Sequence, residues 1–211
     1  MIEVELKFEI PSASRGLFQE KLHALPSVRW LGQIDNTDVY YDTANFDCLQ
    51  QSLFIRMRNR TRLELKFHDH ADPAHTSCSE RTFPLKPEPP QMKEINKLCS
   101  RFIQGWREAN SVEEAIDVNG LVECGRIANH RTQFAHENLI LCLDTVKGLG
   151  DFFEIEVACD EESETQQALA RLYSFVSVLA FPTMRPVQTG YLEQWLTLYS
   201  KPISQLQKEE E

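Results

Sequence analysis

Charged and apolar residues alternate at the start of the chain, in the run Met1-Ile2-Glu3-Val4-Glu5-Leu6-Lys7. In a β-strand the side chains alternate between two faces, so Glu3, Glu5 and Lys7 would share one face at a spacing of about 7 Å. A charged face of one strand is ordinarily solvated. The alternation recurs, however, in Ile55-Arg56-Met57-Arg58, Leu63-Glu64-Leu65-Lys66-Phe67 and Phe153-Glu154-Ile155-Glu156-Val157. Four such faces can meet only if the sheet curls around them, which predicts a barrel with a charged interior; the structural alternative is a sheet whose charged faces meet water.

The signs of these charges indicate a chemistry. Lysine and arginine side chains that converge in a closed space need an anion, and phosphate suits both the planar fork of Arg and the point charge of Lys. Clustered Asp and Glu need a cation in turn, and oxygen ligands around phosphate suit Mg²⁺ or Mn²⁺. The sequence therefore predicts a site for a divalent metal and a phosphate chain.

The composition limits the class of protein. The chain has 211 residues, of which 42% are hydrophobic, and no convincing boundary divides it, so we expect a single domain over residues 1–211. Its formal net charge of −10 argues against nucleic acid or an anionic membrane as the main partner. A polyanionic substrate must therefore meet a local basic pocket.

Further features bear on where the chain works. Its first residues are charged, and no stretch approaches the ~20 apolar residues of a membrane span, so we expect a cytoplasmic protein. The six cysteines are widely spaced and form no CxxC pair, which favours free thiols over disulfides or a zinc site. We expect a monomer, although the sequence gives no direct indication of oligomeric state.

The remaining pattern predicts the elements that position the charged strands. Capping residues, prolines and apolar spacing predict helices over residues 15–25, 91–107, 111–116 and 189–200, and a further helix that starts at Ser163 or Thr165 and is broken at Pro182. Strands are expected over residues 28–42, 79–85, 121–132 and 139–146, with a tight hairpin at residues 59–61 and a turn or short 3₁₀ segment at residues 45–48. On the strand at 79–85, Glu80 is the candidate to face inward.

Three motifs have a functional and a structural interpretation. The histidine-rich stretch at residues 68–75 resembles a transition-metal cluster, but its polar composition and Pro73 favour a loop. Residues 147–151 contain two glycines but lack the Lys-Ser/Thr of a phosphate-binding loop, which favours a turn between strands. His130 and Arg131 are adjacent, so at most one of them faces inward, and Arg131 is the better candidate.

Taken in order, these motifs resemble the CYTH or triphosphate tunnel metalloenzyme superfamily. The signature is ExExK, here Glu3-Val4-Glu5-Leu6-Lys7. The agreement continues through residues 38–43, Arg56-Met57-Arg58, Glu64-Leu65-Lys66, residues 143–145 and Glu154-Ile155-Glu156, and so spans nearly the whole chain. Within the superfamily the chain is most similar to thiamine triphosphatases.

The resemblance implies an α+β fold in which a closed eight-stranded antiparallel β-barrel forms a tunnel with flanking helices. It implies Mg²⁺, or alternatively Mn²⁺, as cofactor, held by Glu3, Glu5, Asp144, Glu154 and Glu156. It implies a substrate site made of Lys7, Arg56, Arg58, Lys66, Arg131, Glu154 and Phe54, of which Lys7, Arg58 and Glu154 serve catalysis. Glu80 matches an inward acidic position of the same family.

Three departures from the family pattern concern the site. Many members carry an acid two residues before Asp144, where this chain has Cys142, so Asp144 would carry the metal role of that strand alone. Members have a Lys shortly before the Tyr of the last helix, whereas this chain reads Thr189-Gly190-Tyr191, and Arg185 is our candidate for the missing charge. The aromatic residue beside the two arginines, a Trp in vertebrate thiamine enzymes, is Phe54 here.

We therefore expect hydrolysis of thiamine triphosphate to thiamine diphosphate and phosphate, with a small-molecule triphosphate as the partner and neither nucleic acid nor a membrane. The nearest alternative is an inorganic triphosphatase that acts on tripolyphosphate, and a class IV adenylate cyclase is a more distant one. From a different class, the barrel would be a phosphate-binding module without turnover, which predicts tight binding and no phosphate release with any divalent cation.

Overall fold

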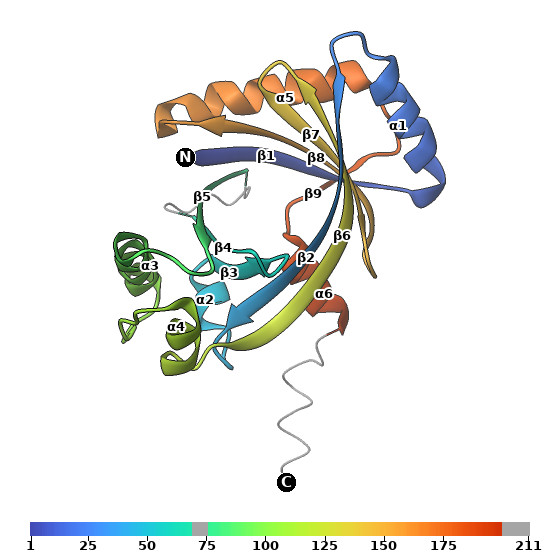
Figure 1. Cartoon of the computed structure of the whole chain (residues 1–211). Helices are drawn as coiled ribbons and strands as arrows, with labels where there is room; N and C mark the ends of the chain where they lie inside the picture. The colour runs from blue at the N-terminus through green and yellow to red at the C-terminus, as the bar shows by residue number, and fades with distance from the viewer. Residues whose placement is uncertain (69–75, 200–211) are drawn as a thin grey trace.

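The structure is a computed structural model that describes residues 1–68 and 76–199. It shows a ring of strands between two groups of helices (Figure 1). Most of the histidine-rich stretch, residues 69–75, lies outside the described residues, so its interpretation as a loop stays a prediction. Its first residue, His68, is described, and the Nδ1 atom of His68 lies 2.8 Å from the backbone oxygen of Ser77.

The strands follow the alternating runs of the sequence. They are β1 (Ile2–Ile10), β2 (Arg29–Asp42), β3 (Leu53–Arg58), β4 (Arg62–Phe67), β5 (Ser77–Pro84), β6 (Val122–His136), β7 (Leu139–Val146), β8 (Gly150–Cys159) and β9 (Arg185–Val187). The α-helices are α1 (Arg15–Ala24), α2 (Asp47–Gln50), α3 (Pro89–Phe102), α4 (Val112–Val118), α5 (Thr165–Leu179) and α6 (Tyr191–Tyr199). Strand β9 was not predicted, because three residues with a proline in the middle carry no alternating pattern.

Eight of the strands form a closed antiparallel ring in the order β5-β4-β3-β2-β6-β7-β8-β1. The ring closes where β1 pairs with β5, for example Glu3 opposite Cys78. Farther along the same edge of β1, β9 pairs with the strand and places Val187 opposite Lys7. The predicted α+β fold with a closed eight-stranded antiparallel barrel is therefore confirmed, and β9 adds a short extension beside β1.

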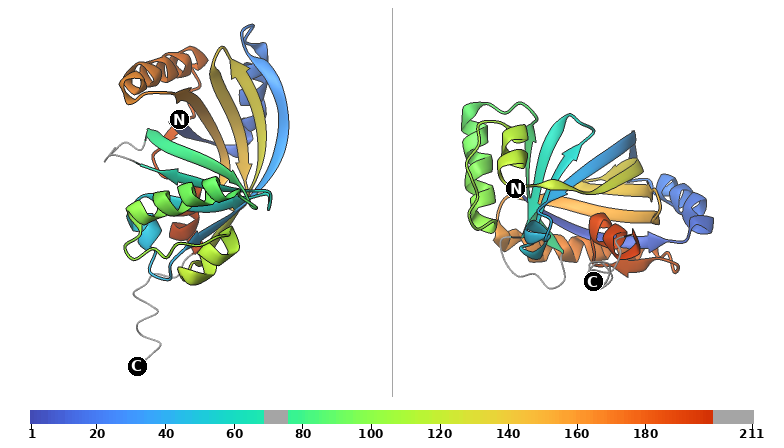
Figure 2. Two further views of the ribbon diagram at one scale, coloured as in Figure 1. Left: turned by 60° about the vertical axis from the view of Figure 1, so that its left-hand side comes forward. Right: turned by 90° about the horizontal axis from the view of Figure 1, so that it is seen from below.

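Helices cover the outside of the barrel on two sides (Figures 1 and 2). Under α1 and α5, Leu6 of β1 and Phe153 of β8 pack with Leu172 in one apolar cluster. Under α3 and α4, Leu65 of β4 packs with Ile95 in a second cluster. The apolar face of each charged run is thus buried against helices, and period-two alternation then turns the ionised face toward the inside of the ring.

Two predicted turns join neighbouring strands as expected. Asn59 and Arg60 have φ angles of 53° and 54°, the left-handed pair that makes a tight hairpin between β3 and β4. Between β7 and β8, Gly148 has a φ of 81°, a conformation that favours glycine. Residues 147–149 therefore act as a turn, and the phosphate-loop interpretation is not needed.

Two local predictions were correct only in part. Of the turn or 3₁₀ segment expected at residues 45–48, a turn is present at residues 44–45, but residues 47–50 form a short α-helix, because the carboxylate of Asp42 accepts two of the first backbone N–H groups. Helix α3 ends at Phe102, before the predicted end at Arg107, and the chain then turns at Gly105 with a φ of 77°. Trp106 still packs against the core, and its Nε1 donates a hydrogen bond to Asn96 Oδ1 at 3.1 Å.

Helix α6 packs on β6 in a third apolar cluster, which includes Leu192, Ile127 and Phe152. The approach is close, because a Cβ atom placed on Gly125 of β6 would lie 2.5 Å from Leu192 Cδ1. The start of α6 is thereby held beside the interior of the barrel. Among the described residues, no helix is both long enough and apolar enough to cross a membrane.

Candidate phosphate and metal site

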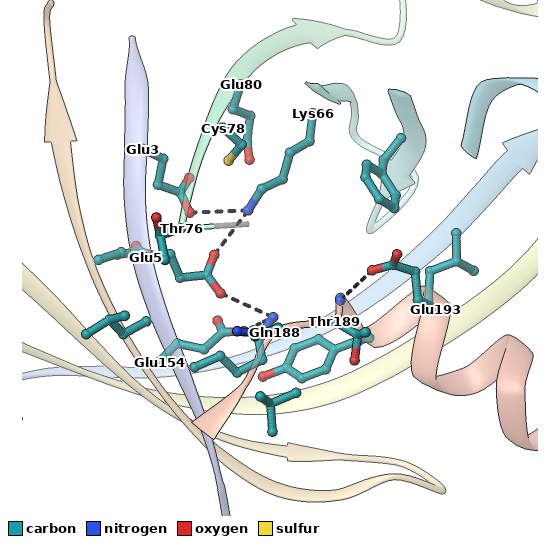
Figure 3. Close-up of a pocket in the computed structure, with 18 of the residues that line it drawn as sticks. Glu3, Glu5, Lys66, Thr76, Cys78, Glu80, Glu154, Gln188, Thr189 and Glu193 are labelled. Atoms are coloured by element: carbon teal, nitrogen blue, oxygen red, sulfur yellow. Dashed lines mark hydrogen bonds and ion pairs between the residues drawn. The ribbon is translucent and has the colours of Figure 1, made fainter. Parts of the chain in front are cut away.

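The inner faces of the strands enclose a cavity of about 360 Å³. Charged side chains from β1, β3, β4, β5, β6 and β8 line it, and the segment from Pro186 to Glu193 completes its wall. Figure 3 shows that Glu3, Glu5, Lys66, Cys78, Glu80 and Glu154 converge on this space from separate strands.

The first group of charges joins β1, β4 and β8. Lys66 Nζ lies 3.4 Å from Glu3 Oε1 and 3.1 Å from Glu5 Oε2, and Lys7 Nζ lies 3.2 Å from both Glu5 Oε1 and Glu154 Oε1. Burial alone would raise the pKa of Glu5, but Lys66 and Lys7 together hold that pKa well below its usual value. Glu5 is therefore ionised, and both lysines carry a full charge beside it.

The second group surrounds Arg131 of β6. The guanidinium donates two hydrogen bonds to Asp144, from Nε to Oδ1 at 2.8 Å and from Nη2 to Oδ2 at 2.6 Å, and also pairs with Glu154. Such a fork fixes the plane of the guanidinium. Asp144 is fully buried and also accepts a hydrogen bond from the hydroxyl of Tyr191 at 2.9 Å. Glu154 thus links the lysine group to the arginine group.

The third group holds the two arginines of β3. Arg58 donates two hydrogen bonds of 2.7 Å to Asp38, and Arg56 Nε donates one of 2.7 Å to Glu64. Arg56 also lies 3.6 Å from Glu80. Burial would raise the pKa of Glu64, but Arg56 and Arg58 lower it to about 2. Both guanidinium groups are therefore held in fixed positions at the cavity wall.

Glu156 differs from the other carboxylates. It lines the cavity, yet its carboxyl group makes no hydrogen bond or ion pair with a side chain in the described ranges, whereas its backbone is paired in β8. Burial, reinforced by the charge of Glu3, raises its pKa to about 8. The pKa of Glu3 is also raised, because burial, Glu5 and Glu80 outweigh the opposing effect of Lys66. These two carboxylates are the ones that a cation would stabilise most.

The charge balance of the cavity fits a metal better than a bare anion. Seven carboxyl groups and five Lys or Arg side chains line it, so a triphosphate would add negative charge to a space in which carboxyl groups already outnumber the cations. Oxygen donors of this kind suit Mg²⁺, which is commonly held by one or two carboxylates together with substrate phosphates. In the described part of the chain, no three His, Cys, Asp or Glu side chains are already gathered as a metal site. The carboxyl oxygens at the cavity wall suit a metal that arrives with its phosphate ligands.

Most of the site residues predicted from the sequence meet in this cavity. They are Glu3, Glu5, Lys7, Phe54, Arg56, Arg58, Lys66, Glu80, Arg131, Glu154 and Glu156. Asp144 does not line it, because its carboxylate is fully buried behind Arg131. His130 points away from Arg131's side and its Nδ1 lies 2.8 Å from Asp35 Oδ1, so the choice of Arg131 as the inward residue is confirmed.

The assignment of Arg185 as the missing charge was wrong. Arg185 is exposed on β9, opposite Glu9, and does not line the cavity. The residues that line the wall directly before Tyr191 are Gln188, Thr189 and Gly190, of which Gln188 and Thr189 are labelled in Figure 3. None of the three carries a positive charge.

Sequence reasoning missed several functional candidates. Asp38, Tyr40 and Glu64 hold the two arginines of β3, and Tyr191 contacts both Asp144 and Lys7. The signal for Asp38 and Tyr40 was present, since both share one face of β2 at period two. The signal for Tyr191 was the family pattern, which has a Tyr in the last helix, whereas helical periodicity alone assigns this residue to the core.

Comparison with known families identifies the architecture. The model of the CYTH domain matches residues 1–191. The chain belongs to the CYTH family. No curated protein matches the chain.

Solved structures share this CYTH fold at low sequence identity. The protein PH1819 from Pyrococcus horikoshii OT3 is 20% identical with a TM-score of 0.63, and the match covers 93% of this chain and 99% of that one. A putative adenylate cyclase from Vibrio parahaemolyticus is 16% identical with a TM-score of 0.60, covering 92% and 97%. A putative adenylyl cyclase from Hippeastrum, HpAC1, described as having a dominant triphosphatase activity, is 21% identical with a TM-score of 0.59, covering 95% and 97%.

Proposed function

We propose that this CYTH protein is a Mg²⁺-dependent triphosphatase that hydrolyses thiamine triphosphate to thiamine diphosphate and phosphate. The observation that carries the proposal is the convergence of five cationic side chains from β1, β3, β4 and β6 on one enclosed cavity that also contains an excess of carboxylates. A compact polyanion that comes with a divalent cation matches this set. We propose a small-molecule triphosphate as the ligand. We also propose that the protein is a monomer and that it works in the cytoplasm.

The side chains of the cavity would have two roles, which are to bind phosphate and to hold the metal. Lys7, Lys66 and Arg131 would bind phosphate oxygens from one side, and Arg56 and Arg58 from the other. Glu3, Glu5, Glu154 and Glu156 would hold Mg²⁺, which when bound offsets phosphate charge and orients the phosphate chain. Asp144 would act on the substrate indirectly, because it fixes the plane of Arg131.

Hydrolysis would proceed by attack of water on the terminal phosphorus. The new P–O bond forms as the bond to the bridging oxygen breaks, the diphosphate leaves with the electron pair, and the proton of the water passes to solvent. Lys7, Arg58 and Arg131 would stabilise the charge that spreads over the phosphoryl oxygens, because they are held in place before the reaction. The enclosed wall keeps the phosphates in line with the water.

The identity of the organic group is the finer part of the proposal. Phe54, at the cavity wall beside Arg56, offers an aromatic face to the thiamine moiety. The alternative is inorganic tripolyphosphate, which needs no such contact. The dominant triphosphatase activity of the Hippeastrum protein supports a triphosphatase over a cyclase for this fold.

A phosphate-release panel tests the proposal. Purified protein would be assayed with thiamine triphosphate, tripolyphosphate and ATP, each with Mg²⁺, Mn²⁺, Ca²⁺ or EDTA, and cyclic AMP would be measured in the ATP arm. We expect the highest kcat/KM with thiamine triphosphate and Mg²⁺. A higher value with tripolyphosphate would assign the inorganic activity, and tight binding without phosphate release under any condition would identify a binding module.

A further inference from the structure

Tyr191 is the first residue of α6 and lines the cavity. Its ring lies beside Lys7, with the Nζ atom 4.5 Å from the ring centre. Its hydroxyl donates a hydrogen bond to Asp144 Oδ2 at 2.9 Å. Tyr191 of α6 therefore contacts Lys7 directly and is connected to Arg131 through the carboxylate of Asp144.

The Asp144 carboxylate connects the Tyr191 hydroxyl to Arg131. Both of its oxygens accept hydrogen bonds from the Arg131 guanidinium, and Oδ2 is shared with the Tyr191 hydroxyl. Because Asp144 is fully buried, water cannot replace a lost donor without rearrangement. The hydroxyl thus limits the orientations that Asp144, and with it Arg131, can adopt.

Tyr191 is itself held firmly. Its ring packs edge-on against Phe152 of β8, with ring centres 5.0 Å apart. The backbone N–H of Gly190 donates a hydrogen bond to Glu193 Oε2 at 2.7 Å, which fixes the first turn of α6. Burial, with Glu154 and Asp144 nearby, raises the pKa of the Tyr191 hydroxyl, so that it stays protonated and remains a donor.

We propose that Tyr191 is a positioning residue for the phosphate grip, in which its ring orients Lys7 and its hydroxyl orients Arg131 through Asp144. The inference rests on the proposed function, because Lys7 and Arg131 are the cations assigned to phosphate. It goes further in making the start of α6 part of the site. An aromatic ring beside an ammonium and a neutral donor on a buried carboxylate have separable effects, so different substitutions should report each one.

The test compares Tyr191→Phe and Tyr191→Leu with Tyr199→Phe. Tyr199 is a matched control, because it ends the same helix and its hydroxyl donates a hydrogen bond to the Gly148 backbone oxygen at 2.9 Å, outside the cavity. Three measurements are made: steady-state kinetics, which give kcat and KM for tripolyphosphate with Mg²⁺; calorimetry in EDTA, which gives the Kd of tripolyphosphate; and NMR of the Arg131 Nε–H resonance, assigned with Arg131→Lys. Melting temperatures check that each variant folds.

Tyr191→Phe is expected to lower kcat about 10-fold with little change in KM, since it removes only the hydrogen bond to Asp144. Tyr191→Leu also removes the ring from Lys7, so KM and Kd are expected to rise about 5-fold as well. The Arg131 resonance is expected to shift in both variants. Tyr199→Phe is expected to match the wild type in all three measurements.

The NMR readout separates this inference from the proposed function. If the wild type cleaves no triphosphate, the proposed function fails, whereas a shifted Arg131 resonance in Tyr191→Phe still supports the positioning role. If that resonance is unchanged, the inference is overturned whatever the activity of the wild type. A kcat for Tyr191→Phe equal to that of Tyr199→Phe, in an active enzyme, overturns it as well.

Discussion

Lys66 Nζ lies 3.1 Å from Glu5 Oε2, although β4 and β1 are not neighbours in the ring and β5 stands between them. The contact therefore crosses the interior of the barrel and does not run along its wall. Lys66 also reaches Glu3 on β1, at 3.4 Å. Lys66 of β4 and the two glutamates of β1 therefore face the same space. A bound phosphate would pair with Lys66, and a bound cation would pair with Glu3 and Glu5, in place of their present contacts with one another.

Removing Lys7 tests the phosphate grip. Lys7→Ala should lower kcat by about 10²–10³, because an oriented charge at the phosphoryl oxygens is lost in a site that largely excludes water. Lys21→Ala is the matched control, since Lys21 does not line the cavity: its Nζ donates a hydrogen bond to the Ala180 backbone oxygen and lies 5.8 Å from the centre of the Phe181 ring. Phosphate release measures both. A Lys7→Ala protein that cleaves triphosphate at close to the wild-type rate would refute the tunnel assignment.

Removing Glu156 tests the metal ligands. Glu156→Ala should also lower turnover by about 10²–10³ and raise the Mg²⁺ concentration needed for half-maximal rate, since an oxygen donor without a competing ion pair is lost. Glu113→Ala, on the exposed face of α4, is the control. A Mg²⁺ titration of the phosphate-release rate measures the effect. An unchanged titration midpoint in an otherwise weakened enzyme would remove Glu156 from the metal ligands.

Glu156 should also make stability depend on pH. Its pKa in the folded protein is raised to about 8 from an ordinary value of 4.5, so the folded state holds a proton that the unfolded chain releases. The associated stability is complete below about pH 4.5 and is lost as the pH rises through about 8. Glu156→Gln should therefore gain on the order of 4 kcal/mol in free energy of unfolding relative to wild type between pH 5 and pH 9.

Urea denaturation in EDTA at pH 5, 7 and 9 measures this difference. Glu113→Gln serves as the exposed control and should track the wild type at each pH. A gain for Glu156→Gln that is the same at all three values would contradict the raised pKa of Glu156.

The two-bond fork from Arg58 to Asp38 should make Arg58→Lys costly. A lysine keeps the charge but cannot make both hydrogen bonds to Asp38 while presenting a fixed group to phosphate, so kcat/KM should fall about 100-fold. Arg60→Lys is the control, because Arg60 is exposed in the hairpin two residues later. Steady-state kinetics with tripolyphosphate compare them. Equal losses in the two variants would contradict a specific role for the fork from Arg58 to Asp38.

Gly125 should be intolerant of a side chain. Gly125→Ala places a Cβ atom 2.5 Å from Leu192 Cδ1, so α6 must shift or Leu192 must repack. We expect a destabilisation of about 1–3 kcal/mol and a lower kcat, because the start of α6 moves with Tyr191. Gly16→Ala on α1 is the control, since nothing lies within 4 Å of its Cβ position. Urea denaturation and kcat measure the two effects; a variant that melts like Gly16→Ala would contradict the close packing.

The barrel could be predicted because the pattern that specifies it lies within short segments of the sequence. Each charged run alternates at period two, and four such runs leave few ways to bury their apolar faces. The outward positions of Leu6, Leu65 and Phe153 follow directly from that alternation. Strand β9 could not be predicted, because its three residues are held by an edge of β1 that only the folded ring presents.

The sequence predicted most of the residues that line the site, but not which of their side chains contact one another. Alternation placed Glu5 and Lys66 on inner faces, but their direct contact depends on barrel diameter, which no local pattern specifies. Alternation along β7 places Asp144 on the inner face as well, yet its carboxylate accepts two hydrogen bonds from Arg131 and does not line the cavity. Gln188 and Tyr191 come from a segment whose place depends on α6 packing against Gly125.

Strand β1 pairs with β5, β8 and β9, and none of these lies next to it in the chain. During synthesis the ExExK strand can pair with β5 over Ile2–Val4 first, but its pairing along Ile2–Ile10 requires residues 150–159 to have left the ribosome. Contacts between such distant segments slow folding, since the long intervening loop must be closed before any pairing is gained. The strand that carries three of the proposed phosphate and metal ligands is thus expected to acquire its structure late, and a chain cut short before β8 would leave it exposed to aggregation.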